Sequence, residues 1–270
     1  MMTLDLDLGP SKAKLARARE HAEALKREAT KRIGQETTHA VEFSPIDPQT
    51  GWCSITLIPQ KIEEPRLQVI LGDVIHNLRC ALDYLIPPLV AASNAKLSTT
   101  HEFPIKLGEG DYAAKVGSKI VAKGKGPLRH VVHGLSVVEA WQPYNAKGDP
   151  ETDPLWGVHR FSNADKHRQL ATFGLVPLGR FEIKWDSGIK VEDDIVEEIN
   201  DWEVDHDIPV GRIRFDPPYV TNLRAVGRVK LDIRFITPRF GKENKLALKL
   251  ASVDGVVDHV AKVVDSFRDL

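Results

Sequence analysis

A regular apolar spacing near the carboxyl end narrows the folds open to this chain. From residue 243 to 268, apolar side chains recur at steps of four and three: Leu246, Leu250, Val253, Val257, Val260, Val264 and Phe267. That spacing places them on one stripe of an α-helix. Because the stripe must be buried against other apolar surface, the sequence predicts a helix at about 243–268 that packs in a bundle.

Three further segments have helical patterns. An Ala-rich stripe that stops at Gly34 predicts a helix at about 11–33. A Leu-rich stripe predicts a second helix at about 65–86, which the prolines that begin at Pro87 would end. A third helix is predicted at about 155–170, and its sequence is unusually polar.

Strand-like sequences fall into two separate blocks. At about 38–58, THAVEF and WCSITLI flank turn-forming residues and predict a hairpin. At about 171–186, LATFGLV and RFEIKW flank PLG and are predicted to pair with each other. RIRF and RVKLDIRFI predict strands within about 210–236. Together with the helices, these blocks predict a single α+β domain over 1–270, with a helical bundle packed beside antiparallel sheet.

The charges of the chain nearly cancel. Lys and Arg number 37, Asp and Glu number 38, and the formal net charge is -1 at pH 7. A chain with this balance has no overall field that would draw it to nucleic acid or to an anionic membrane. Binding to such partners would therefore have to come from a local patch.

Cysteine usage indicates a reducing compartment, and the apolar runs are too short for a membrane helix. Only Cys53 and Cys80 are present, and neither lies in a C-x-x-C pair or at zinc-finger spacing from a histidine. The acidic start, MMTLDLDLGP, is unlike a signal peptide, and no apolar run approaches the roughly 18 residues of a membrane helix. We therefore expect a cytoplasmic protein with no membrane partner and no cofactor.

The polar helix at 155–170 is the most site-like feature. One half of its helical wheel carries Trp156, His159, Arg160, Asn163, Lys166, His167 and Leu170. The other half is not properly apolar either, so whichever side packs inward brings polar groups that need partners. The alternative is that these side chains face solvent. A metal held by His159, Asn163 and His167 is not predicted, because the two histidines are two turns apart with an Asn between them.

The helix at 65–86 carries a second polar group. His76, Arg79 and Asp83 lie within about 60° of one another on its wheel, nearly opposite the Leu stripe. The simplest interpretation is a solvated back face. The alternative is a helix covered on both sides, in which case this group and the polar helix converge. Their imidazole, guanidinium and carboxylate groups would suit acid/base chemistry on a phosphodiester.

Four motifs resemble, in the same order, a recurrent family of bacterial and phage proteins of uncharacterised activity. They are LGDVIHNLRCALDYL at 71–85, FPI at 103–105, WQPY at 141–144 and NADKHRQL at 163–170. The resemblance implies that the two polar helices form one unit. The resemblance implies no particular activity for this chain.

Arg160 and His167, with six residues between them, also resemble the Arg-x4-6-His motif of HEPN domains. These are helical-bundle ribonucleases of toxin and phage-defence systems. The resemblance implies that Arg160 stabilises the phosphate, that His167 acts on the 2′-hydroxyl or the leaving oxygen, and that a homodimer assembles the site. The predicted β hairpins, and Phe161 directly after the arginine, depart from that pattern.

Two functions therefore stay open. The first is a protein that binds or acts on RNA or another phosphate-bearing ligand. Its candidate catalytic residues are His167, Arg160, Asn163, His76 and Asp83, and its candidate binding residues are Arg79, His159 and Lys166. The second is a non-catalytic structural or interaction protein, such as a phage or mobile-element accessory protein, in which the same residues form a buried polar network.

Overall fold

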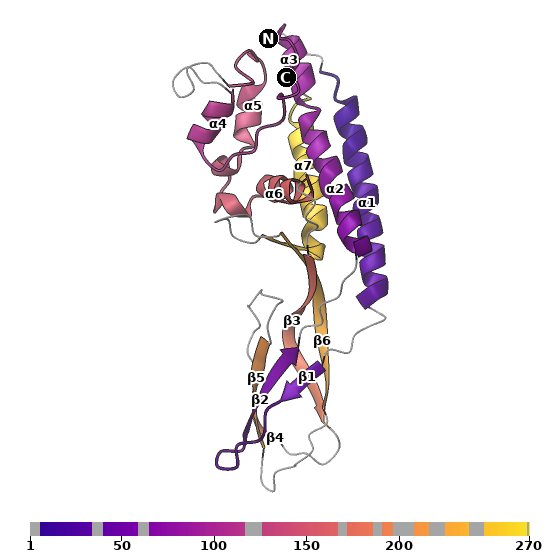
Figure 1. The fold of residues 1–270 in the computed structure, drawn as a ribbon, viewed down its shortest axis with the longest axis vertical. Helices are drawn as coiled ribbons and strands as arrows, with labels where there is room; N and C mark the ends of the chain where they lie inside the picture. The colour runs from indigo at the N-terminus through magenta and orange to yellow at the C-terminus, as the bar shows by residue number, and fades with distance from the viewer. Residues whose placement is uncertain are drawn as a thin grey trace.

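Helices gather at one end of an elongated molecule, and most strands lie toward the other (Figure 1). The computed structural model describes residues 6–33, 40–58, 65–116, 126–166, 172–185, 191–196, 208–215, 225–237, 246–268 and 270. Both labelled chain ends lie at the helical end. The predicted α+β class is confirmed.

Three helices run side by side along the helical end, and a fourth lies across them (Figure 1). The first three are α1 (Gly9–Ile33), α2 (Pro65–Asp83) and α7 (Val253–Asp265), and the fourth is α6 (Pro154–Lys166). The shorter segments are α3 (Ile86–Ala92), α4 (Glu109–Val116), α5 (Leu135–Ala140) and the 3₁₀ turns η1 (Pro143–Asn145), η2 (Pro150–Thr152) and η3 (Leu250–Ser252).

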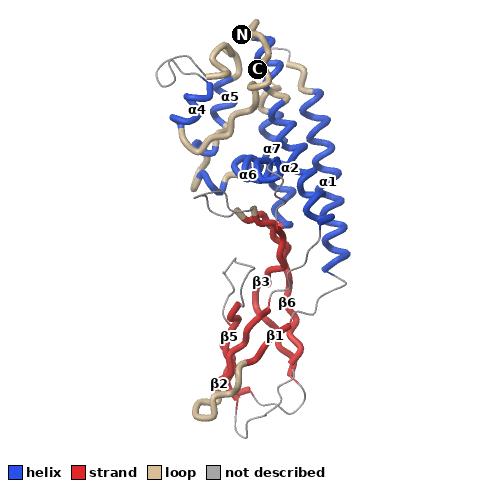
Figure 2. The backbone as a smooth tube through the Cα atoms, viewed as in Figure 1, coloured by secondary structure: helices blue, strands red, loops and turns tan. Residues whose placement is uncertain are grey.

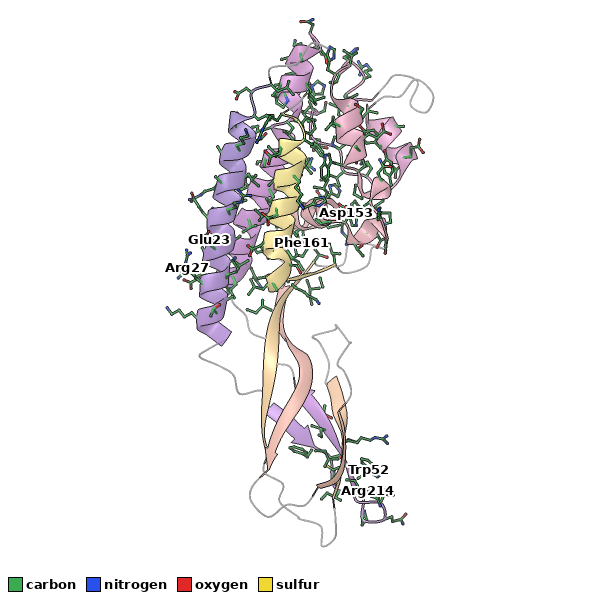
Figure 3. All side chains as sticks on the ribbon, turned by 180° about the vertical axis from the view of Figure 1, so that it is seen from behind. Glu23, Arg27, Trp52, Asp153, Phe161 and Arg214 are labelled. Carbon is green, nitrogen blue, oxygen red and sulfur yellow. The ribbon has the colours of Figure 1, made fainter. Side chains whose placement is uncertain are left out.

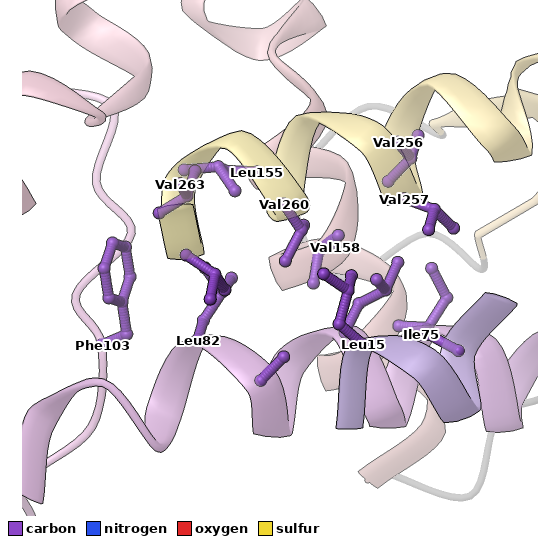
Figure 4. Packing of buried hydrophobic residues seen from close by; sticks show 14 of the residues in the cluster. Leu15, Ile75, Leu82, Phe103, Leu155, Val158, Val256, Val257, Val260 and Val263 are labelled. Atoms are coloured by element: carbon purple, nitrogen blue, oxygen red, sulfur yellow. The ribbon is translucent and has the colours of Figure 1, made fainter. Parts of the chain in front are cut away.

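The apolar stripes of these helices form one core. Leu82 of α2, Val158 of α6 and Val260 of α7 are each 0% exposed and point into the shared interior (Figure 4). Full burial of such a side chain contributes roughly 1.5–3 kcal/mol. The stripe predicted for the carboxyl-terminal helix thus packs in a bundle, as expected from its spacing.

The strands form two antiparallel sheets (Figure 2). One has the order β1-β2-β5-β4, with β1 (Ala40–Phe43), β2 (Trp52–Ile58), β5 (Ile208–Phe215) and β4 (Val191–Val196). The other has the order β3-β6-β7, with β3 (Thr172–Trp185), β6 (Ala225–Ile236) and β7 (Ala247–Lys249). The predicted hairpin at 38–58 is confirmed by the pairing of β1 with β2.

The two sheets relate differently to the helical core. Ile233 and Phe235 of β6 belong to it, at 1% and 0% exposure. Cys53, Ile55 and Ile213 are buried in the four-stranded sheet and lie outside that cluster. The β3–β6 ribbon therefore connects the bundle to a separate small core, and the prediction of one domain stays a prediction.

The predicted pairing inside 171–186 is wrong. These residues contribute to a single strand of 14 residues, and β3 pairs along its length with β6. A shift in register between Leu178 and Glu182 takes up the extra residues beside the PLG sequence. A turn is unnecessary there because β6 offers a partner long enough for both halves of the segment.

Two predicted helix boundaries also need correction. The carboxyl-terminal helix begins at Val253, because the residues before it form β7 against β6 and then η3. The second helix ends at Asp83, and a new helix starts at Ile86 with prolines in its first turn, where the missing N–H costs nothing. The polar helix is described only as far as Lys166, so its predicted end at 167–170 lies outside the described residues.

Candidate functional site

The polar face of α2 is covered over part of its length. Arg79 is buried, with a side chain that is 7% exposed, whereas His76 is exposed and its Nε2 lies 3.5 Å from the Cys80 Sγ. α6 packs against α2 near Gly72, where an added Cβ would lie 3.5 Å from the Asp165 Oδ1. The solvated-face interpretation is therefore wrong for Arg79 and correct for His76.

Arg79 and Asp83 form an ion pair that also holds the chain at Phe103. Arg79 Nη2 lies 2.8 Å from Asp83 Oδ1, and Nε donates to Oδ2 at 3.1 Å. The same Nη2 donates to the Phe103 carbonyl at 2.8 Å, and the Phe103 N–H donates back to Asp83 Oδ1 at 2.9 Å. Burial raises the pKa of the Asp83 carboxyl, and the Arg79 charge and the Phe103 N–H offset part of that rise.

Glu102 extends this network toward solvent. Its Oε2 lies 3.5 Å from Arg79 Nη2, and its Oε1 accepts a hydrogen bond from Lys115 Nζ at 2.9 Å. Burial acts to raise the pKa of Glu102, but Lys115, Arg79 and Lys166 together lower it. Arg79 Nη1 is buried and has no hydrogen-bond partner within the described part of the chain.

His159 of α6 is a partly buried, neutral imidazole. Its ring stacks on Trp156 with centroids 5.1 Å apart, and its Nε2 lies 3.0 Å from the Asn163 amide nitrogen. The Asn163 amide donates in this arrangement, so Nε2 accepts and Nδ1 carries the ring proton. Burial is the main cause that lowers the pKa of His159 to about 4.

Several charged side chains act on His159. Arg79, Lys106 and Lys166 each lower its pKa further, and among the groups found to act on it only Glu102 raises it. Three cations and Glu102 act on His159, but Asp83 pairs with Arg79, and the Asp165 carboxylate also lies where α6 meets α2. Lys106 and Lys166 form none of the ion pairs of the Arg79 network, and with His159 they define a basic edge where α6 lies on α2.

His159 should make the stability of the protein depend on pH. Its folded-state pKa of about 4 lies below the ordinary value of 6.5, so between these values the unfolded chain binds more protons at this site. The free energy of unfolding therefore rises as the pH increases through this window, and above it the contribution is complete. Replacing His159 with glutamine is expected to flatten the rise, measured by urea denaturation at several pH values. An unchanged slope would contradict a buried neutral imidazole.

The other predicted site residues are only partly brought together. Arg160 is buried, and its Cζ lies 5.9 Å from the centroid of the Trp156 ring. Lys166 is exposed at the end of α6. His167 lies outside the described residues, so its pairing with Arg160 stays a prediction. No group of three or more His, Cys, Asp or Glu side chains suited to a metal occurs among the residues described.

Three residues of this edge were missed by the sequence interpretation: Glu102, Lys106 and Lys115. Glu102 and Lys106 directly flank the FPI sequence at 103–105. FPI lies in the sequence between the two polar helices and belongs to the same set of motifs. Its place in that set could have indicated that the residues flanking FPI lie beside both helices. Lys115 is placed by the fold of α4, which no local pattern links to this edge.

Comparisons with known proteins leave the function to be argued from this geometry. No protein-family model, no curated protein and no solved structure matches the chain. The two resemblances inferred from motifs therefore stay predictions. Within the described ranges, no helix has the length and apolar character needed to cross a membrane.

Proposed function

We propose that the protein binds a phosphate-bearing ligand, with single-stranded RNA as the leading candidate, where α6 lies on α2. One observation carries the proposal: a neutral His159 lies near Lys106 and Lys166, neither of which takes part in the ion pairs that Arg79 makes with Asp83 and Glu102. An anionic ligand would supply a partner for these two lysines. Local fields of this kind attract nucleic acid even when the whole protein is close to neutral.

The neutral imidazole supports a role beyond charge attraction. Asn163 fixes the tautomer of His159, so the ring offers one defined N–H donor to a phosphate oxygen. Lys106 is partly buried and Lys166 is exposed, which suits phosphate contacts that a ligand reaches from solvent. Cleavage of the bound RNA is the narrower proposal, with Arg160 and His167 as catalytic residues in a homodimer. Its test is the loss of RNA cleavage in a His167→Ala variant.

Binding is tested by fluorescence anisotropy with a labelled single-stranded RNA in a salt series. Lys106→Ala and Lys166→Ala are each expected to weaken binding and to reduce the slope of log affinity against log salt by about 0.7. Each lysine that contacts a phosphate releases counterions, and its removal abolishes that release. Inorganic phosphate as a competitor separates recognition of phosphate alone from recognition of RNA.

Lys12 provides the matched control. It is an exposed lysine on α1, a helix that is itself locally basic and is not part of this edge. Lys12→Ala is expected to leave RNA binding unchanged. An equal loss in the Lys12 variant would place binding on α1 instead, and an absence of RNA binding by the unaltered protein would refute the proposal.

A second candidate function is a non-catalytic interaction protein in which these residues only hold the fold together. The bond from Arg79 to the Phe103 carbonyl and the bond from the Phe103 N–H to Asp83 favour it, because they tie α2 to the chain before α4. This alternative predicts that substitution of Asp83 lowers the stability of the protein. It also predicts that substitution of Lys106 or Lys166 changes neither stability nor RNA binding. The anisotropy experiment therefore separates the two functions.

A further inference from the structure

A cavity of about 500 Å³ lies between α6, α7 and β7. Its volume falls in the range of roughly 300–1,000 Å³ that is usual for small-molecule sites. Phe161 lines it, and on the α6 wheel Phe161 is about 160° from His159. The cavity is thus separate from the basic edge. Asp153 and Phe161, which both line it, lie beside α7 at the helical end (Figure 3).

The cavity has an apolar floor and a polar rim. Ile75 of α2, Val158 and Phe161 of α6, and Val256 of α7 line it and are all buried. The exposed lining residues include Glu151, Thr152, Lys249 and Ser252. An occupant with an apolar body and one polar end would match this division.

Two helical glycines line the cavity. Gly157 of α6 and Gly255 of α7 both line it, although glycine is the least favourable helix residue after proline. Neither has a positive φ. A Cβ on Gly255 would meet nothing within 4 Å, and one on Gly157 would meet only Leu246 Cδ2 at 4.0 Å. Packing therefore does not require glycine at either position, and each position has room for a larger side chain.

The charges at the cavity select the polar end of an occupant. Glu151 and Asp153 supply two carboxylates against the single ammonium of Lys249 among the described lining residues. Asp153 is 8% exposed, and its Oδ1 accepts the N–H of Leu155 at 2.8 Å, which fixes the carboxylate at the start of α6. We propose that this cavity binds a small amphiphile with an apolar body and an amine head group.

Isothermal titration with hexylamine, hexan-1-ol and hexanoate tests the proposal. Hexylamine is expected to bind saturably, and hexan-1-ol about fivefold more weakly because it lacks the charge that the carboxylates attract. Gly255→Leu is expected to weaken hexylamine binding about tenfold or more by filling the site. Glu151→Gln should reduce the preference for the amine, while Glu23→Gln on α1 should not.

Gly110 supplies the matched control for the glycine variants. It lies in α4, away from the cavity, and a Cβ there would also meet nothing within 4 Å. Gly110→Leu is expected to leave hexylamine binding intact. If Gly255→Leu fails to fold, Gly157→Leu tests the same volume. Unchanged binding in the cavity variants that fold, or hexan-1-ol or hexanoate binding as tightly as hexylamine, would overturn the proposal. RNA binding should be unaffected by these variants, so the two proposals fail separately.

Discussion

Replacing Asp83 with alanine is expected to lower the free energy of unfolding by about 3 kcal/mol. The change would leave the Arg79 guanidinium, which is 7% exposed, without its closest carboxylate. It would also remove the acceptor of the Phe103 N–H. A buried charge that loses its closest carboxylate and an N–H that loses its acceptor are costly, whereas the intact pair contributes far less than that loss. Urea denaturation followed by circular dichroism measures the change.

Asp265 offers a matched control for Asp83. It pairs with Arg268 at 2.7 Å, but both side chains are more than half exposed, at 57% and 61%. Asp265→Ala is therefore expected to change the free energy of unfolding by less than about 1 kcal/mol. If the Asp83 and Asp265 variants were equally stable, the network around Arg79 would not be the buried connection described above.

The second large effect is expected at Phe235. This side chain is 0% exposed and belongs to the helical core, although it lies on strand β6. Phe235→Ala is expected to cost about 4 kcal/mol, because it removes buried apolar surface and leaves a cavity between strand and helices. Chemical denaturation measures the loss, and Val132→Ala, at a residue that is 72% exposed, should cause almost none. A small loss at Phe235 would mean that the ribbon is not anchored in the bundle.

The sequence predicted those parts of the fold that depend on local pattern. The stripe in α2 and the stripe from Val253 onward are spaced for one helix face, so each could be recognised without knowing its partner. The β1–β2 hairpin was equally accessible, because its turn residues lie between its own strands. These elements need only short stretches of chain to specify them.

Elements that depend on distant partners could not be predicted in the same way. The residues before Val253 continue a helical spacing, yet Ala247–Lys249 pair with β6 as a strand. β3 contains turn-like residues but stays extended because β6 lies beside it. At the candidate site, the pattern of α2 could not show that Arg79 is covered while His76 is not, since the chain at Phe103 that covers Arg79 comes from outside both helices.

The four-stranded sheet joins pieces of chain that are made at very different times. Cys53 of β2 pairs with Ile213 of β5, so the centre of this sheet cannot close until the ribosome has passed the latter residue. Until then β1 and β2 exist only as an isolated hairpin, which has little stability in water and presents an open strand edge. That edge of β2 is therefore covered only after β5 has been made.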